Sequence, residues 1–302
     1  MCQQPDVYVE VMPADPKSVR ADRQRDDLSA ILAIEQLDRD LFRADVAPSN
    51  RGRFSLYGGQ VAAQTLRAAG ITVPPDRVAH SLHGYFLRPG QVDRPVLLHV
   101  DRDRDGGSFS ARHARAVQDG EVIFSMLASF HTPEESPVFD GVTTNGGPDP
   151  DSLPAMRSPL LVDVREVTRT RISESQMRHS DRFWIRTPTP LSDDPLEHAC
   201  AITYCSDLGS GFGQVETEGL APGGPSIDHS IWFHEPIRAD KWMLVELWPA
   251  KAANARGVYH GSLRSADGRL GAMFTQEMLL RHRELDPTIL RKLAEYFGTS
   301  DT

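Results

Sequence analysis

The chain of 302 residues repeats its own strand pattern at a nearly constant spacing. His80-Ser81-Leu82 opens an apolar run that closes on a proline, and His229-Ser230-Ile231 opens a similar run 229 − 80 = 149 residues later. Asp119-Gly120 recurs as Asp267-Gly268, 267 − 119 = 148 residues later. Matching strand patterns at one spacing indicate that the chain is a duplicated unit.

Both halves have the same order of predicted elements. Residues 58–74, GGQVAAQTLRAAGITVP, are rich in helix formers and predict a helix that ends near Gly70. Residues 195–211, PLEHACAITYCSDLGSG, predict the matching helix, with Pro195 in its first turn and Gly209 just past its end. Each Asp-Gly pair lies between β-rich runs and predicts a hairpin with a tight primed turn. Each half is therefore expected to be an α+β unit, in which one helix precedes antiparallel strands.

Shifts in composition divide the chain. Residues 1–27 are polar and predict a loose arm, while 136–159 are dense in Pro, Gly and Asp and predict a surface linker. The first repeat is then expected at 28–135 and the second at 160–285, followed by an amphipathic helix and tail in 286–302. A sheet that wraps around its helix would bury it, and two such units can pair their sheets edge to edge.

Charge and cysteine usage exclude several classes of function. The net charge of −9 disfavours nucleic acid and anionic membranes as partners. No run of about 18 apolar residues predicts membrane insertion, and the first residues lack the pattern of a signal peptide, so we expect a cytoplasmic protein. Cys2, Cys200 and Cys205 show no CxxC spacing and the histidines no HExxH pattern. We therefore expect no metal and no disulfide, and predict buried or inert thiols.

Five segments in chain order resemble the acyl-CoA thioesterase II family. They are LFRADVAPSNRGRFSLYGGQVAAQTLRAA, HSLHGYFLRPG, DGGSFSARHARAVQDGEVIFSMLASFHTPE, SIDHSIWFHEP and ANARGVYHGSLRSADGRLGAMFTQEM, which together span residues 41–278. The resemblance implies a tandem (double) hotdog fold, in which each repeat is an antiparallel sheet wrapped around a central helix. It also implies hydrolysis of acyl-CoA to a free fatty acid and coenzyme A without a cofactor, by a homodimer or homotetramer.

The resemblance further implies a catalytic group of a carboxylate, a hydroxyl and an amide in the second repeat, carried here by Asp207, Ser226 and Gln276. Ser226 stands where a well-known family member has threonine, so the hydroxyl is kept and a methyl is lost. A carboxylate can accept a proton from an attacking water, while an amide and a hydroxyl can hold that water. Ala128 lies 276 − 128 = 148 residues before Gln276, so we expect one site per chain.

Structural roles are the alternative for each of these residues. Asp207 and Ser226 would then be turn residues, and Gln276 would pair across the sheet. A Ser-His-Asp relay of Ser226 with the adjacent Asp228 and His229 is disfavoured, because neighbours in a strand point to opposite faces. The chain also lacks GxSxG, so Asp228 and His229 are assigned mainly structural roles.

Four further residues are candidates for substrate binding. Gly58 and Gly59 open the first predicted helix, where glycine permits close approach of a neighbouring strand or a ligand. Arg88 and Arg112 lie in family-like segments, and arginine binds phosphates such as those of coenzyme A. The alternatives are helix packing for the two glycines, and a solvated face or a surface ion pair for the two arginines.

Two rival functions share features with this hypothesis. A hotdog enoyl-CoA hydratase typically pairs an Asp with a nearby His, but the residues from Leu208 to Phe212 after Asp207 include no histidine. A non-catalytic acyl-CoA binding protein would have no need of the carboxylate, hydroxyl and amide. Both rivals are therefore weaker than hydrolysis.

Overall fold

The computed structural model describes most of the two predicted repeats. The described residues are 27–47, 55–141, 144, 146–156, 158, 160–167, 171–173, 176–177, 181–215 and 224–281. The predicted N-terminal arm, apart from Asp27, and the helix predicted in 286–302 lie outside them.

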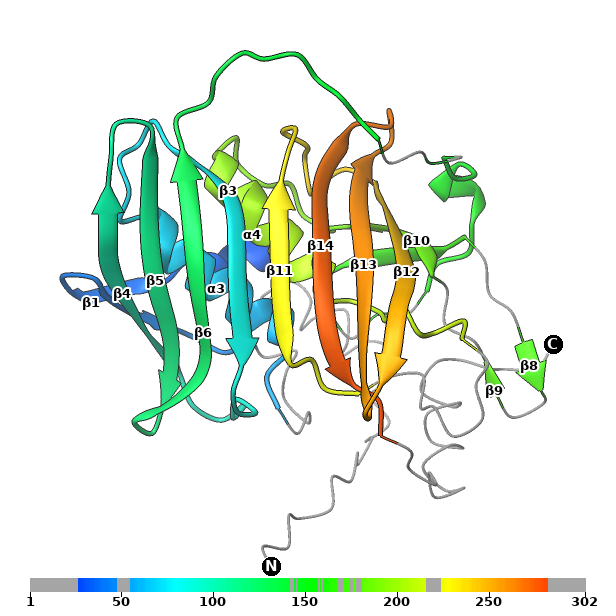
Figure 1. Ribbon diagram of the computed structural model, residues 1–302, viewed down its shortest axis with the longest axis horizontal. Helices are drawn as coiled ribbons and strands as arrows, with labels where there is room; N and C mark the ends of the chain where they lie inside the picture. Colours follow the sequence, from blue (N-terminus) through cyan, green and yellow to red (C-terminus); the bar gives the residue numbers. More distant parts are fainter. Residues whose placement is uncertain are drawn as a thin grey trace, which may run out of the picture.

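A twelve-stranded antiparallel sheet forms the body of the molecule (Figure 1). Its strand order is β1-β2-β4-β5-β6-β3-β11-β14-β13-β12-β10-β7. The first half supplies β1 (Glu35–Asp38), β2 (Leu41–Ala44), β3 (Val78–Phe86), β4 (Val96–Asp105), β5 (Phe109–Gln118) and β6 (Glu121–His131). The second half supplies β7 (Asp163–Glu166), β10 (Arg182–Arg186), β11 (Asp228–Phe233), β12 (Met243–Ala253), β13 (Arg256–Ser265) and β14 (Leu270–Leu279). Strands β8 (Arg171–Ser173) and β9 (Gln176–Met177) form a separate pair.

The two halves of the sheet have the same topology. From each edge inward, the strands of a half come in the chain order first, second, fourth, fifth, sixth and third, and the halves meet where β3 pairs with β11. Leu82 lies opposite Ile231 in that pair, and these residues are 231 − 82 = 149 apart, the spacing of the sequence repeat. The pair therefore lies on the pseudo-twofold axis. This confirms the predicted double hotdog and its edge-to-edge pairing.

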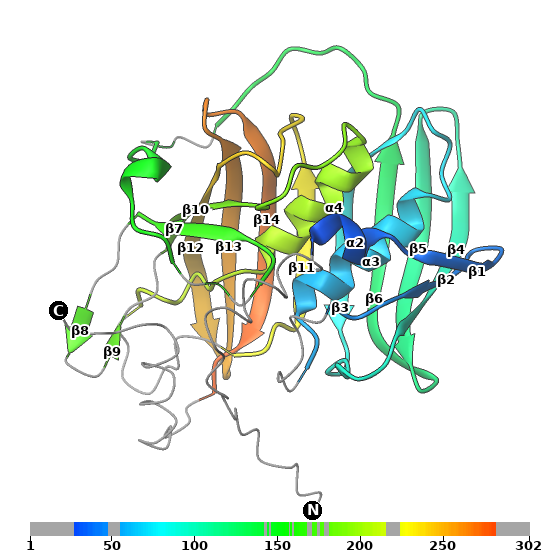
Figure 2. The same ribbon diagram turned by 180° about the vertical axis from the view of Figure 1, so that it is seen from behind.

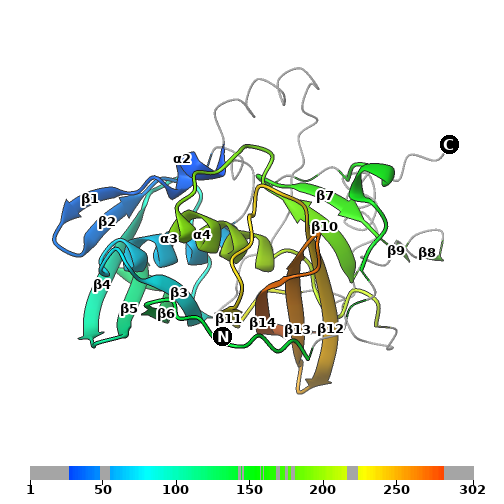
Figure 3. The ribbon, with the colours of Figure 1, turned by 90° about the horizontal axis from the view of Figure 1, so that it is seen from above.

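The helices lie together on one face of the sheet, which curves around them (Figures 2 and 3). They are α2 (Leu28–Leu32), α3 (Gly58–Gly70) and α4 (Pro195–Ser206). A short 3-10 helix, η2 (Pro150–Ser152), lies within the predicted linker. Every residue of α3 is buried except Gly58 and Arg67. Its many alanines let α4 and the sheet approach closely, so the helix predicted from composition is buried as the hotdog fold requires.

Helices α3 and α4 meet at two junctions related by the pseudo-twofold axis. At the first junction the end of α4 meets the start of α3, and Tyr57 Oη donates to Tyr204 O at 2.8 Å. At the second junction the end of α3 meets the start of α4, and Arg67 Nη1 lies 2.7 Å from Asp194 Oδ2. Contacts between the repeats therefore hold both ends of each helix.

The two predicted Asp-Gly turns differ. Asp119 and Gly120 both have positive φ, 52° and 77°, as the predicted primed turn requires. The prediction was wrong for the second turn, because its loop is one residue longer: Ser265 N–H donates to Arg269 O at 3.0 Å. There Gly268 alone takes a positive φ, 93°, as the last residue of a three-residue loop.

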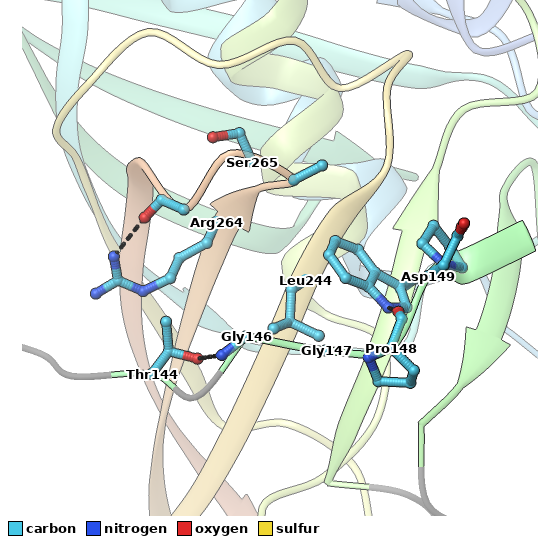
Figure 4. A pocket seen from close by; sticks show the side chains of 12 residues that line it. Thr144, Gly146, Gly147, Pro148, Asp149, Leu244, Arg264 and Ser265 are labelled. Atoms are coloured by element: carbon cyan, nitrogen blue, oxygen red, sulfur yellow. Dashed lines mark hydrogen bonds between the residues drawn. The ribbon is translucent and has the colours of Figure 1, made fainter.

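The connection between the repeats arcs over one end of the sheet (Figure 1). Asp140 in this segment accepts hydrogen bonds at 2.6 and 3.0 Å from the buried Arg264 of β13. Beside it lies a pocket of about 210 Å³, whose lining includes Trp184, Leu244 and Arg264 (Figure 4). None of the predicted site residues lines this pocket. Within the described residues, no helix is long and apolar enough to span a membrane.

Candidate active site

The structure brings Asp207, Ser226 and Gln276 together in one hydrogen-bonded group. Gln276 Nε2 donates to Asp207 Oδ1 at 3.1 Å and also to Ser226 Oγ. The Ser226 hydroxyl donates to the same Asp207 Oδ1 at 3.3 Å. The carboxylate, hydroxyl and amide predicted from separate segments thus contact one another directly.

Local structure explains how each side chain reaches the group. Asp207 is the C-cap of α4, so it lies at the end of the buried helix. Alternation along β14 turns Phe274, Gln276 and Met278 toward the buried face, with Gln276 only 2% exposed. Ser226 lies two residues before β11 and forms an isolated bridge with Met278. Helix end and strand alternation therefore aim all three side chains at one place.

The start of α3 in the first repeat completes this group at the first junction. Gly59 N–H donates to Asp207 Oδ2 at 2.7 Å. This N–H belongs to the first turn of a helix, where free donors and the helix dipole favour negative charge. The first repeat thus donates a hydrogen bond to the carboxylate that the second repeat supplies.

Positions 58 and 59 have no room for a side chain, which explains why both are glycine. A Cβ atom on Gly58 would lie 2.8 Å from Asp207 Oδ2, and one on Gly59 would lie 2.6 Å from Tyr204 O. Both distances are shorter than real Cβ contacts. The two glycines therefore let α3 approach the end of α4, which makes helix packing their direct role.

Replacing Gly58 with alanine is expected to lower kcat about 10- to 100-fold, because the new methyl group displaces the Asp207 carboxylate. The melting temperature should change little, since the atoms in the way are the end of a side chain and the Phe86 ring. Steady-state kinetics and thermal unfolding measure the two effects. The matched control is Gly107→Ala, whose methyl meets nothing within 4 Å. Unchanged kcat in Gly58→Ala would show that the carboxylate position is not critical.

Comparison with known proteins identifies the family. Residues 47–131 match the family model of the acyl-CoA thioesterase N-terminal domain, and residues 133–280 match that of the C-terminal domain. The chain belongs to the acyl-CoA thioesterases. The thioesterase is 34% identical over 286 residues to human acyl-coenzyme A thioesterase 8, covering 84% of this chain and 88% of the relative.

A bacterial relative and a solved structure support the same family. Acyl-CoA thioesterase 2 of Haemophilus influenzae is 31% identical over 281 residues, covering 84% of this chain and 96% of the relative. The crystal structure of an acyl-CoA thioesterase II from Mycobacterium marinum has a TM-score of 0.70 and 35% identity, covering 85% of this chain and 98% of that one. The protein is thus a thioester hydrolase of the acyl-CoA thioesterase II family.

Several titratable side chains, some of them fully buried, surround the group in this thioesterase. Tyr259 is fully buried opposite Gln276, and its burial together with the charge of Asp207 raises the pKa of the phenol. Burial also raises the pKa of Asp228 and lowers that of His229 to about 4. One side of the group, toward Gln276, Tyr259 and His229, is therefore buried, whereas Asp207 and Ser226 are partly exposed.

Asp228 and His229 have partners other than Ser226. The carboxylate of Asp228 accepts the Glu277 N–H at 2.7 Å, and His229 Nε2 lies 2.7 Å from Ser206 Oγ. His229 is fully buried, whereas Asp228 is half-buried, as expected for neighbours on opposite faces of a strand. These contacts favour the structural roles expected for both residues.

The two candidate arginines have protein partners. Arg88 is half-exposed, with Nη2 2.6 Å from Glu121 Oε2. Arg112 is fully buried, and its guanidinium donates five hydrogen bonds, to Thr72 Oγ1 and O, the carbonyls of Arg104 and Ala111, and Asp105 Oδ1. It thereby ties the turn after α3 to the β4–β5 hairpin. The geometry favours a surface ion pair for Arg88 and a buried structural role for Arg112.

The first repeat offers no amide at the matching position. Because Leu82 and Ile231 correspond, their partners Ala128 on β6 and Phe274 on β14 correspond as well, at a spacing of 274 − 128 = 146 residues. Phe130, rather than Ala128, therefore corresponds to Gln276. The spacing falls below 148 because the second hairpin is shorter: Phe274 follows its partner Gly261 by 274 − 261 = 13 residues, whereas Ala128 follows its partner Arg112 by 128 − 112 = 16.

The cysteines take no part in this group. Cys200 and Cys205 are fully buried in α4 as free thiols, which confirms the expected burial. Burial raises the pKa of Cys205 to about 12 and strongly raises that of Cys200. Both thiols are therefore protonated and unreactive at neutral pH. Cys2 lies outside the described residues.

Proposed function

We propose that this thioesterase hydrolyses acyl-CoA by direct attack of a water molecule, with Asp207 as general base and with Gln276 and Ser226 holding the water. The observation that carries the proposal is the hydrogen-bonded contact of the carboxylate, amide and hydroxyl at the first junction. The N–H of Gly59, in the first turn of α3, supports an ionised carboxylate at this place. Activation of a water molecule requires a base that takes its proton and hydrogen-bonding groups that hold it, and the carboxylate, amide and hydroxyl supply these.

The proposed reaction uses the side chains as follows. Asp207 accepts one proton as the water oxygen bonds to the thioester carbonyl carbon. The tetrahedral oxyanion then collapses, the carbon–sulfur bond breaks, and the proton held by Asp207 passes to the departing sulfur. The products are a fatty acid and the free thiol of coenzyme A, and no covalent enzyme intermediate forms.

A single-turnover experiment in ¹⁸O-labelled water, with enzyme in excess over acyl-CoA, tests direct attack. We expect one ¹⁸O atom in the fatty acid, and no thiol burst ahead of acid formation in a matching multiple-turnover assay. Unlabelled acid would indicate that the Asp207 carboxylate itself attacks and forms an anhydride. A burst with acyl groups trapped by hydroxylamine would indicate an acyl-serine. No thiol release from short to long acyl-CoAs by the folded protein would favour a binding protein.

Ser226→Ala is expected to lower kcat about tenfold, because the water and the carboxylate lose one hydrogen-bonding partner. Ser226→Thr restores the hydroxyl and should keep kcat within about threefold of the wild type. Thiol release from a single acyl-CoA, followed over a range of concentrations, gives kcat and KM for each variant. Equal kcat in wild type and Ser226→Ala would remove the hydroxyl from the proposal.

A further inference from the structure

Gln276 has an amide that must face one way for the proposed reaction. Its Nε2 donates to Asp207 and Ser226, both of which present acceptor oxygens. The other end of the amide, Oε1, is buried and makes no hydrogen bond with any of the described residues. A buried carbonyl oxygen without a donor is costly, and nothing else so far named prevents the amide from turning over. The orientation of Gln276 therefore needs a donor on the Oε1 side.

His229 is placed to supply that donor. Strands β11 and β14 pair with Ser230 opposite Thr275, so continuing the register by one residue places His229 opposite Gln276. Both side chains turn to the buried face, being 0% and 2% exposed. His229 Nδ1 is buried and, in the described part of the chain, is likewise without a well-formed hydrogen bond. Gln276 nevertheless acts on the imidazole, because its contact raises the pKa of His229 against the larger lowering by burial.

The other ring nitrogen of His229 decides where the proton lies. Nε2 is 2.7 Å from Ser206 Oγ, which also lies 3.0 Å from Thr203 O. A neutral imidazole carries one N–H. If it were on Nε2, Nδ1 would be an acceptor facing the acceptor Oε1 of Gln276. If it is on Nδ1, the Ser206 hydroxyl turns its single proton from Thr203 O to Nε2, and the ring donates to Gln276 Oε1, so both buried acceptors of the pair gain a donor.

We propose that a hydrogen-bond chain from Ser206 through His229 in its Nδ1–H tautomer to Gln276 Oε1 holds the amide with its N–H groups toward Asp207 and Ser226. His229 is then a positioning residue, because it acts on the reaction through Gln276. The chain starts next to Asp207, at the end of α4, and ends on β14, so it couples the positions of the base and the amide. The inference rests on the role of Gln276 in the proposed function.

The tautomer can be observed directly by ¹⁵N NMR of the wild-type protein with labelled histidines. The signal of His229 is assigned among 11 histidines by its loss in His229→Asn. We expect the Nδ1–H form near neutral pH, the opposite of the form that free neutral imidazole side chains prefer. The Nε2–H form would overturn the proposal. This measurement needs no active variant.

Three substitutions of His229 distinguish the effect of its hydrogen-bond donor from the effect of its ring volume. In His229→Asn the amide nitrogen is bonded to Cγ, as Nδ1 is, and can donate to Gln276. In His229→Gln the amide lies one bond further out, at the place of Nε2, and His229→Phe has no donor. We expect kcat within about threefold of wild type for Asn, and about 10- to 100-fold lower for Gln and Phe, with KM nearly unchanged. A ranking that follows side-chain volume or melting temperature would instead indicate packing alone.

A double-mutant cycle with Gln276→Ala distinguishes failure of this inference from failure of the proposed function. We expect Gln276→Ala to lower kcat about 100-fold and His229→Phe to add nothing in that background. If Gln276→Ala leaves kcat unchanged, the proposed role of Gln276 is wrong and the inference falls with it. If His229→Phe lowers kcat by the same factor in both backgrounds, the positioning role is wrong while the proposed function stands.

Discussion

Replacing Asp207 with alanine is expected to lower kcat for acyl-CoA hydrolysis about a thousandfold, within the range of about 10²–10⁴ typical for the loss of a general base. The variant loses the proposed general base, and Gln276 and Ser226 lose the acceptor to which both donate. Thiol release measured over a range of acyl-CoA concentrations gives kcat and KM. KM should change much less than kcat, because the carboxylate is proposed to act on the attacking water rather than to hold the substrate.

Two further variants make the result for Asp207 specific. Asp207→Asn keeps the shape and one acceptor oxygen but cannot take a proton, so its kcat should fall nearly as far as that of Asp207→Ala. Asp103→Ala removes an exposed carboxylate and should leave kcat at the wild-type value. If Asp207→Asn were fully active, the carboxylate would not be the base. If Asp207→Ala were fully active as well, the catalytic group would lie elsewhere.

Replacing Arg112 with alanine is expected to lower the free energy of unfolding by about 3–5 kcal/mol. The substitution removes five hydrogen bonds and leaves the carbonyls of Thr72 and Arg104 without the donors that Arg112 supplied. It also leaves a cavity where a long side chain was fully buried. Urea denaturation followed by fluorescence or circular dichroism measures the loss. Arg112→Lys keeps the charge without the fork geometry and should recover only part of it.

Arg88→Ala is the matched control for Arg112. Arg88 and Glu121 have side chains 51% and 61% exposed, so losing their ion pair should cost less than about 1 kcal/mol. A loss in Arg112→Ala no larger than that in Arg88→Ala would contradict the structural role of the buried network. The same two variants test the binding of coenzyme A phosphates, since an arginine that holds the substrate raises KM when it is removed.

Local patterns predicted much of the fold. The helix formers of residues 58–74 and Pro195 with Gly209 located α3 and α4, because helix propensity and helix ends depend on neighbouring residues. Duplication predicted the symmetric sheet, since a repeated unit buries its surface in a repeated way. The residues of the proposed catalytic group followed from family resemblance, and in the structure they contact one another.

Features that depend on other parts of the chain were not predicted. The turn between β12 and β13 is made by Asn254 and Ala255, both at positive φ, although it has no glycine to mark it. The hydrogen bond from Gly59 to Asp207 joins residues 148 apart. No local pattern in either segment marks that contact. The proposed hydrogen bond from His229 to the Gln276 amide likewise depends on strand register, which a single segment does not determine.

Fusion of the two repeats has a consequence for how this thioesterase could diversify. In a homodimer of single repeats, symmetry makes the two helix junctions identical, so every change in one is a change in both. Here the first junction holds Asp207 against Gly59, while the second is closed by the ion pair of Arg67 with Asp194. On the proposed function, the first junction carries the chemistry and the second only holds the helices together, so selection can act on each junction separately.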